Sequence, residues 1–428
     1  MIYLTGGKTD IRLARVIISF LPVPNNHTKQ TEFMKTENYD VIVIGGGAIG
    51  LATAFQLGKR KASTLVLEQF TFVNQLGSSA GVSRQFRIPY PDEYMVQMAL
   101  DAQPYWDELE KETGTSLLDK VGTLWFGDPA VHSTEGNIAE AEAALKALNV
   151  PYTTLTAKEI EEKYHFKNLP ETYTGLFQPD GASINFKATI ETLLNLCKKE
   201  ETVQLEENSP VLKINQIGEL FEIETPNGIY ITKKLSIIPG PYINSVINLL
   251  DFKIEATYWN MSSAYFKKTD PNIQYPTWFV FQNAIGENSN QFYGFPSVDW
   301  DHPEYIRVAP DFVIEPIEEP ADRTLIPNPQ ELGYTADWVK EHMTGLAAEP
   351  EYTSTCLIAL SKIPNKELLI DFAPNYVPNH KNIVLYATGW AAKFTPFLGK
   401  IMADLVLDGH TDFDIKPFQL GYKYFKAF

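Results

Sequence analysis

Cysteine and histidine are scarce in this chain. Its 428 residues include two cysteines, Cys197 and Cys356, and seven histidines. Two thiols exclude a disulfide framework and a site built from several thiolates, and no His-Glu-x-x-His spacing occurs, so we expect no bound metal. So little cysteine is typical of a reducing compartment and favours a cytoplasmic location.

An excess of positive charge and a long apolar run are also missing. The net charge of −17 argues against a nucleic-acid partner, because binding to phosphate needs a basic surface. The run Val16–Leu21 is far too short to span a bilayer, so we expect no membrane partner. Residues 1–37 differ in character from the rest of the chain, and we interpret them as a disordered extension rather than a targeting segment.

The stretch from Tyr39 to Glu68 has the pattern of a βαβ dinucleotide-binding unit. Tyr39–Ile44 is a continuous apolar run typical of a buried parallel strand, and a helix pattern comes next at Leu51–Leu57. A second strand, Thr64–Leu67, ends at Glu68. A lone glycine turn is weak evidence, but strand, glycines, helix, strand and acid in this order predict a dinucleotide site.

Three glycines of the turn have separate roles in such a site. Gly45 permits the tight turn, Gly47 lets the backbone approach the pyrophosphate, and Gly50 lets helix and strand pack closely. The pyrophosphate is then expected at the helix N-terminus, around Ala48 and Ile49, where unpaired N–H groups and the positive end of the helix dipole face it.

Glu68 is the acid of this unit. It lies 18 residues beyond Gly50, where a carboxylate accepts hydrogen bonds from the adenosine ribose. The same carboxylate disfavours NADP, because it repels the extra phosphate. The βαβ unit alone does not distinguish FAD from NAD.

Motifs after the second strand resemble the monomeric sarcosine oxidase and N-methyl amino acid oxidase family, FAD-dependent enzymes of the D-amino-acid-oxidase-like superfamily. They occur in family order, at residues 77–87, 94–106, 121–127, 177–182, 293–297, 370–371 and 387–394. The resemblance covers most of the chain from about Asn38 onward. It implies FAD as the cofactor and an α/β + β fold, in which a Rossmann-like FAD-binding domain of the glutathione-reductase type is interleaved with an antiparallel-sheet substrate domain.

The same resemblance implies how the chain divides between the two domains. The FAD-binding domain would take residues 38–122, 183–255 and 365–428, and the substrate domain residues 123–182 and 256–364. Strand-like runs at 264–266, 278–281 and 291–295 fit the antiparallel sheet. A late strand, Asn382–Ala387, and a helix, Lys400–Leu407, would return the chain to the FAD-binding domain.

Further cofactor contacts come from the family pattern. They are Gln69, Ser78, Ser83, Arg84, Val211, Gly240, Cys356, Gly389 and Lys393. Arg84 matches an arginine against the flavin ring, where positive charge stabilises reduced anionic flavin. Cys356 is the candidate for a thioether bond to the flavin, although two more residues separate it from Asp371 than in the family. The alternative is a buried structural cysteine, which is also what we expect of Cys197.

Arg87 and Lys393 match the family's two cationic residues that clamp the substrate carboxylate. A guanidinium grips a carboxylate through two hydrogen bonds, and the ammonium of Lys393 would share it. The alternative for Arg87 is a surface ion pair. Tyr293 matches an active-site tyrosine on the sheet over the flavin, and its alternative is a half-buried sheet aromatic.

Three positions depart from the family pattern. Arg307 stands where the family has a lysine that activates oxygen, so both residues are cationic but the arginine charge is more diffuse. Asp311 falls near a family histidine and either binds a substrate amine or pairs with Arg307. Trp390 replaces a histidine and is similar to the tryptophan of the piperideine-carboxylate oxidase of nikkomycin biosynthesis. It either stacks on a planar substrate or fills the pocket.

These residues predict a monomeric enzyme that oxidises the C–N bond of a small secondary or cyclic amino acid to an imine, while molecular oxygen becomes hydrogen peroxide. Because Arg307 replaces the oxygen-activating lysine, a flavin-dependent dehydrogenase with another electron acceptor is the alternative. A dinucleotide-binding module without catalysis is the third possibility.

Overall fold

The computed structural model describes residues 37–133, 135–364, 367–421 and 424–427. The expected extension therefore lies outside the described residues, apart from Glu37, which already belongs to the first strand, β1 (Glu37–Ile44). Of the helices in the described ranges, none combines the length and the apolar character needed to cross a membrane.

The first large sheet has eight strands and holds the predicted βαβ unit. Its order is β10-β11-β12-β1-β2-β9, with β20 beside β12 and β19 beside β20. β1, β2, β9, β12 and β20 pair in parallel, while β10, β11 and β19 pair antiparallel. The strands other than β1 are β2 (Thr64–Leu67), β9 (Val203–Glu206), β10 (Lys213–Ile217), β11 (Leu220–Thr225), β12 (Gly228–Ile237), β19 (Leu369–Phe372) and β20 (Ile383–Ala387).

Three helices pack together beside this sheet: α1 (Ala48–Lys59), α5 (Phe186–Lys199) and α8 (Thr395–Asp408). The predicted strand, helix and strand of the βαβ unit are thus confirmed as β1, α1 and β2. Helix α8 begins earlier than the predicted Lys400, at Thr395. Its Pro396 did not prevent this, because proline is tolerated in a first helical turn, where its missing N–H has no partner to lose.

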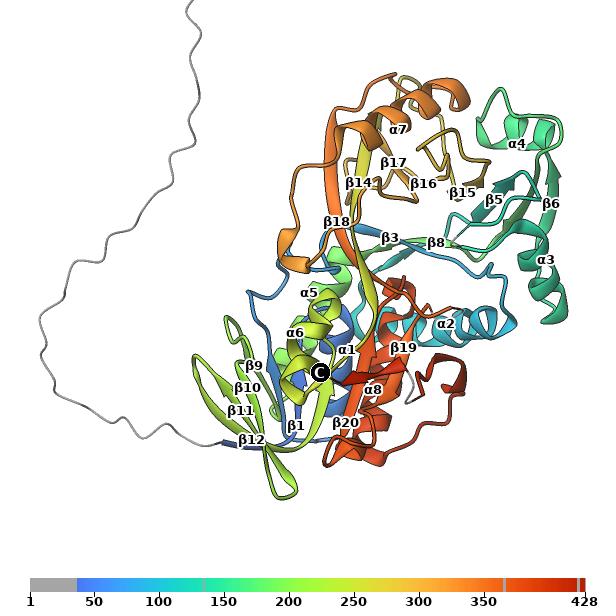
Figure 1. The fold of residues 1–428 in the computed structure, drawn as a ribbon. Coiled ribbons are helices and arrows are strands. Elements are labelled where there is room, and N and C mark those ends of the chain that lie inside the picture. The colour runs from blue at the N-terminus through green and yellow to red at the C-terminus, as the bar shows by residue number, and fades with distance from the viewer. Residues whose placement is uncertain (1–36, 134, 365–366, 422–423, 428) are drawn as a thin grey trace, which may run out of the picture. The chain divides into compact units, whose positions relative to one another are not determined.

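The second large sheet also has eight strands, in the order β18-β14-β17-β16-β15-β5-β7-β6. All its neighbours pair antiparallel except β15 and β5. Helix α7 (Pro329–His342) packs on β14 and β17, as Figure 1 shows. The strands are β5 (Thr123–Gly127), β6 (Thr153–Thr156), β7 (Thr174–Gln178), β14 (Ala256–Lys267), β15 (Thr277–Phe281), β16 (Phe292–Gly294), β17 (Tyr305–Pro310) and β18 (Tyr352–Ser361).

A small third sheet lies between the two large ones (Figure 1). It consists of β3 (Ser83–Phe86), β8 (Ala182–Asn185) and β4 (Leu118–Asp119), paired in the order β3-β8-β4. β3 lies within the motif at residues 77–87, and so this motif belongs to the small sheet between the two large ones. The remaining longer helices are α2 (Glu93–Thr113), α3 (Ile138–Ala147) and α4 (Ala157–Tyr164).

Candidate active site

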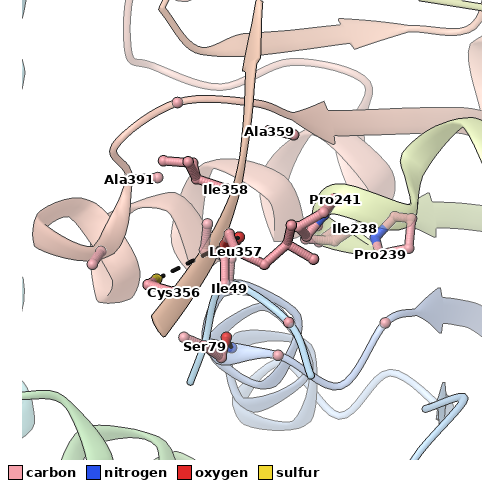
Figure 2. A pocket seen from close by; sticks show the side chains of 18 of the residues that line it. Ile49, Ser79, Ile238, Pro239, Pro241, Cys356, Leu357, Ile358, Ala359 and Ala391 are labelled. Carbon is pink, nitrogen blue, oxygen red and sulfur yellow. Dashed lines mark hydrogen bonds between the residues drawn. The ribbon is translucent and has the colours of Figure 1, made fainter. Parts of the chain in front are cut away.

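A cavity of about 270 Å³ runs from the carboxyl ends of β1 and β2 to the face of the second large sheet. Its walls come from the first turn of α1, the loop before β3, strands β16 to β18, and the segment between β20 and α8. Figure 2 shows Cys356 to Ala359 of β18 in one wall, with Ile49 and Ser79 beside the first turn of α1.

One end of the cavity is made of backbone. Gly45 has a φ of +112°, and a Cβ there would lie 2.3 Å from the carbonyl oxygen of Ile238. A Cβ on Gly50 would lie 1.9 Å from the oxygen of Gly45, so helix and turn approach too closely for a side chain. Gly47, the residue before α1, has no side chain that could cap the helix, and the Ser79 hydroxyl accepts from the backbone N–H of Ala48 at 3.0 Å. A glycine turn that opens a helix fits the pyrophosphate of a dinucleotide.

Glu68 is held rigidly beside this turn. Its carboxylate accepts hydrogen bonds from the backbone N–H of Gly46 at 2.8 Å and of Phe70 at 2.9 Å. Burial raises the pKa of Glu68, and these two N–H groups oppose that rise. Glu68 lines the cavity together with Val211 and Gly240, so the ribose position predicted from the sequence lies in the wall.

Arg84 forms hydrogen bonds both with the loop before β3, within the motif at residues 77–87, and with β18. Its guanidinium donates to the carbonyl oxygens of Ser83 at 2.8 Å and Ser78 at 3.0 Å, and to the Sγ of Cys356 at 3.1 Å. The hydroxyl of Ser78 donates to the Leu357 oxygen at 2.6 Å. Cys356 is half-buried and lines the cavity, whereas Cys197 is fully buried in α5, as predicted.

The two predicted clamp residues lie at the other end of the cavity. Arg87 is 4% exposed, forms an ion pair with Glu135, and lies over the ring of Tyr90, 4.6 Å from its centroid. Lys393 is also 4% exposed, and its Nζ lies 5.3 Å from the centroid of the same ring. The two cations therefore converge on Tyr90. The alternative of a surface ion pair for Arg87 is wrong, because both partners are buried.

Two carboxylates offset these cations. Glu135 pairs with Arg87, and Glu367 accepts a 3.4 Å hydrogen bond from the backbone N–H of Trp390. Burial, with Arg87 in second place, lowers the pKa of Lys393 to about 7, although Glu367 and Glu135 oppose that shift. Burial also raises the pKa of Glu367, against the effect of Lys393. No motif or spacing in the sequence singles out either acid.

Tyr293 and Arg307 face the cavity from the second large sheet. Arg307 is 6% exposed, lies 4.1 Å from the centroid of the Phe295 ring, and donates to the Ser83 carbonyl oxygen at 3.2 Å. Burial raises the pKa of Tyr293 to about 12, against the effect of Arg307, so its phenol keeps its proton. Asp311 is buried and lines the same cavity, as does Trp390 from the segment between β20 and α8.

Ser83 is the one predicted site residue that the structure does not place in the cavity lining. Ser83 begins β3 and is fully buried, whereas Arg84 and Gln85 after it both line the cavity. The Ser83 hydroxyl donates to Asp301 at 3.0 Å instead. All the others line one cavity: Gly45, Gly47, Ala48, Ile49, Gly50, Glu68, Gln69, Ser78, Arg84, Arg87, Val211, Gly240, Tyr293, Arg307, Asp311, Cys356, Gly389, Trp390 and Lys393.

Among the described residues, no group of three or more His, Cys, Asp or Glu side chains could hold a metal ion. The donor set fits a flavin dinucleotide instead. The glycine turn and the N-terminus of α1 suit the pyrophosphate, and Arg84 and Arg307 supply positive charge in the cavity wall.

Comparison with known proteins agrees with this geometry. Residues 40–405 match the family described as FAD dependent oxidoreductase. A protein of Dictyostelium discoideum named as a bifunctional amine oxidase is 34% identical over 91% of this chain, which spans 37% of that longer protein. Monomeric sarcosine oxidase of Bacillus sp. (strain NS-129) is 26% identical over 90% of this chain and 97% of its own length.

A solved structure is also similar. NikD, an unusual amino acid oxidase essential for nikkomycin biosynthesis, matches in its open form with a TM-score of 0.84 and 33% identity, over 90% of this chain and 98% of its own. The predicted fold and family resemblance are confirmed. The chain therefore belongs to the family of FAD-dependent oxidoreductases, its cofactor is FAD, and its relatives in that family are amine and amino acid oxidases.

Proposed function

We propose that this enzyme oxidises the C–N bond of a small secondary or cyclic amino acid to an imine, with molecular oxygen reduced to hydrogen peroxide. The observation that carries the proposal is the convergence of Arg87 and Lys393 on one aromatic ring at the end of the cavity. A guanidinium and an ammonium side by side suit a carboxylate, and a carboxylate held there places the adjoining Cα–N bond further along the cavity.

Bound FAD supplies the acceptor for the electron pair that leaves the substrate. The chain's own residues position the amino acid and control protons. Arg87 cannot lose its charge and anchors the carboxylate, whereas Lys393 titrates near neutral pH and grips it only when protonated. Asp311 is buried in the wall that carries Tyr293, where its carboxylate suits the substrate amine.

Trp390 is the residue from which we infer the shape of the substrate. Trp390 lines the cavity, and Lys393 Nζ donates to its backbone carbonyl oxygen at 2.7 Å, so the two residues are neighbours in the cavity wall. A flat side chain there suits a planar or cyclic amino acid better than an extended one. Proline, pipecolate and piperideine-carboxylate are therefore the first compounds to test, and sarcosine and N-methyl amino acids come after them.

Oxygen is the proposed acceptor because Arg307 provides a fixed positive charge in the cavity wall, where superoxide would be stabilised. A dehydrogenase with another acceptor is the second candidate. It is favoured by the contacts of the Arg307 guanidinium with the Ser83 carbonyl oxygen and with Asp301, which leave less of the positive charge of Arg307 available to oxygen.

The low cysteine content supports a cytoplasmic location. The monomeric sarcosine oxidase among the relatives of this chain supports a monomer.

We also propose that Cys356 carries the flavin covalently. Its side chain is half-buried and lines the cavity, and its sulfur accepts a hydrogen bond from the Arg84 guanidinium at 3.1 Å. Acid precipitation of the purified protein should leave the flavin in the pellet, and Cys356→Ala should release it to the supernatant. Release from the unsubstituted protein would overturn this assignment, and Cys197→Ala is the matched control.

An anaerobic screen tests the function itself. The purified flavoprotein is mixed with each candidate amino acid, and loss of the oxidised-flavin absorbance identifies substrates. For each substrate, peroxide yield in air is then compared with dye reduction without oxygen. Stoichiometric peroxide supports the oxidase, and dye reduction with little peroxide supports the dehydrogenase. The absence of bleaching by every compound would overturn both.

A further inference from the structure

Near Arg307, outside the cavity lining, lies a buried acid that the reaction described above does not use. Asp301 is 6% exposed and does not line the cavity. Its Oδ2 lies 3.9 Å from Nη1 of Arg307. The Arg307 guanidinium therefore lies over the Phe295 ring and within ion-pair distance of Asp301, while Arg307 itself lines the cavity.

Asp301 is itself held by two hydroxyl groups from other elements. It accepts hydrogen bonds from Ser83 of β3 at 3.0 Å and from Tyr265 of β14 at 3.4 Å. The Ser83 hydroxyl in turn accepts from the indole N–H of Trp300 at 3.2 Å. These bonds fix Oδ2 of Asp301, the same oxygen that faces Arg307.

The two charges remain partly unsatisfied by hydrogen bonds. Among the described residues, neither Oδ1 of Asp301 nor Nε of Arg307 has a hydrogen-bond partner, and both atoms are buried. A buried carboxylate without a nearby cation is expensive, and a guanidinium cannot release its proton. Because solvent screens buried pairs weakly, the charge that Arg307 presents to the cavity depends on Asp301.

We propose that Asp301 is a positioning residue that fixes the Arg307 guanidinium against Phe295 and reduces the positive charge it presents to the flavin. The inference rests on the part of the proposed function that places the isoalloxazine beside Arg307. A purely structural role would instead be limited to joining the loop after β16 to β3 through the bond to Ser83.

Sulfite binding to the flavin-loaded, full-length protein separates these roles. Sulfite adds to oxidised flavin as an anion, bleaches its visible absorbance, and binds more tightly where positive charge is close to the ring. It needs no amine substrate, so the result is independent of whether the proposed reaction occurs. The flavin midpoint potential is the second readout.

Asp301→Asn keeps the shape and an acceptor for Ser83 but removes the negative charge. We expect the sulfite Kd to fall about tenfold, because Arg307 then acts uncompensated, and the midpoint potential to become more positive. Asp299→Asn is the matched control. It removes the same charge from an exposed side chain two positions away in the chain and should change neither quantity.

A double-variant cycle tests whether Asp301 acts through Arg307. In an Arg307→Gln background, Asp301→Asn should leave the sulfite Kd unchanged. The proposal is overturned if Asp301→Asn alone leaves the Kd and the potential as they were, or if its full effect persists without Arg307. Should Asp301→Asn not retain flavin, Ser83→Ala replaces it. That variant keeps both charges and frees the carboxylate, so an unchanged Kd would contradict the proposal and a shifted Kd would support it.

Discussion

At the end of the cavity proposed for the pyrophosphate the chain presents backbone, through three glycines at the start of one helix. At the end proposed for the substrate carboxylate it presents charge, carried by the buried Arg87, Glu135 and Lys393 and the half-buried Glu367 from widely separated segments. The first end is rigid because no side chain fits there. The second end is adjustable, because its net charge depends on which acid or amine holds a proton.

This difference separates two kinds of recognition. A backbone cradle binds a group that many cofactors share, and it has no proton to gain or lose. A cluster of two buried cations, the buried Glu135 and the half-buried Glu367 is already balanced, so an incoming carboxylate must compete with Glu135 for Arg87. We therefore expect steric damage at one end to abolish cofactor binding, and charge changes at the other to alter substrate binding and its pH dependence.

The largest effect is expected from Gly45→Ala. The new Cβ would lie 2.3 Å from a backbone oxygen at a φ of +112°, so the turn must open, with a loss of about 4 kcal/mol in the free energy of unfolding. Flavin content and Tm report this. The control is Gly333→Ala, in the exposed interior of α7, where nothing lies within 4 Å and stability should rise by about 0.5–1 kcal/mol. Full flavin content in Gly45→Ala would contradict the account.

Arg87→Gln comes next. Loss of the guanidinium should reduce kcat/KM for a carboxylate substrate by roughly a thousandfold, and it should destabilise the protein by about 3 kcal/mol, because Glu135 is left buried without its partner. Adding Glu135→Gln should restore much of the stability, measured as Tm, but none of the activity. Recovery of activity in the double variant would exclude Arg87 as the carboxylate clamp.

The pH dependence at Lys393 is a smaller effect with a definite sign. Its pKa of about 7 means that the ammonium is charged below that pH and neutral above it. The affinity for an unreactive carboxylate without an amine should therefore be greatest at low pH and fall about tenfold between roughly pH 6 and roughly pH 9. Lys393→Arg should remove this fall, whereas Lys400→Arg, outside the cavity lining, should not.

The smallest effect is expected at Glu68, in the pyrophosphate end. Glu68→Gln removes the charge and keeps an acceptor for only one of the N–H groups of Gly46 and Phe70, which bind different carboxylate oxygens, so FAD affinity should fall by about 1 kcal/mol without a change in substrate pH dependence. Flavin release during dilution measures this. A change in the pH profile of carboxylate binding would mean that the two ends are coupled.

The pyrophosphate end was predictable from the sequence because its parts are neighbours in the chain. Strand, turn, helix and Glu68 occur one after another, and each has a signature in residue type and spacing. The clamp cations and Trp390 were predictable by resemblance to a family. Only the structure shows that Arg87 and Lys393 converge, because it places both cations over the ring of Tyr90.

The partners of those cations could not be predicted. Glu135 and Glu367 lie in loops without a motif, and what matters is their burial beside a charge, which no local pattern encodes. Ser83 was misplaced for a related reason. A motif locates a strand, but the direction of each side chain depends on where the strand begins, and here that direction aims Ser83 at Asp301.

Anaerobic titration of the holoenzyme with matched pairs of compounds tests the carboxylate clamp most directly. Each pair is a cyclic amino acid and the amine that lacks its carboxylate, such as pipecolate and piperidine. We predict that the amino acid bleaches the flavin and that the amine does so at least a hundredfold less efficiently. This factor is roughly what the charge-assisted hydrogen bonds to one buried carboxylate contribute to binding. Equal bleaching by both would show that no carboxylate is held between Arg87 and Lys393.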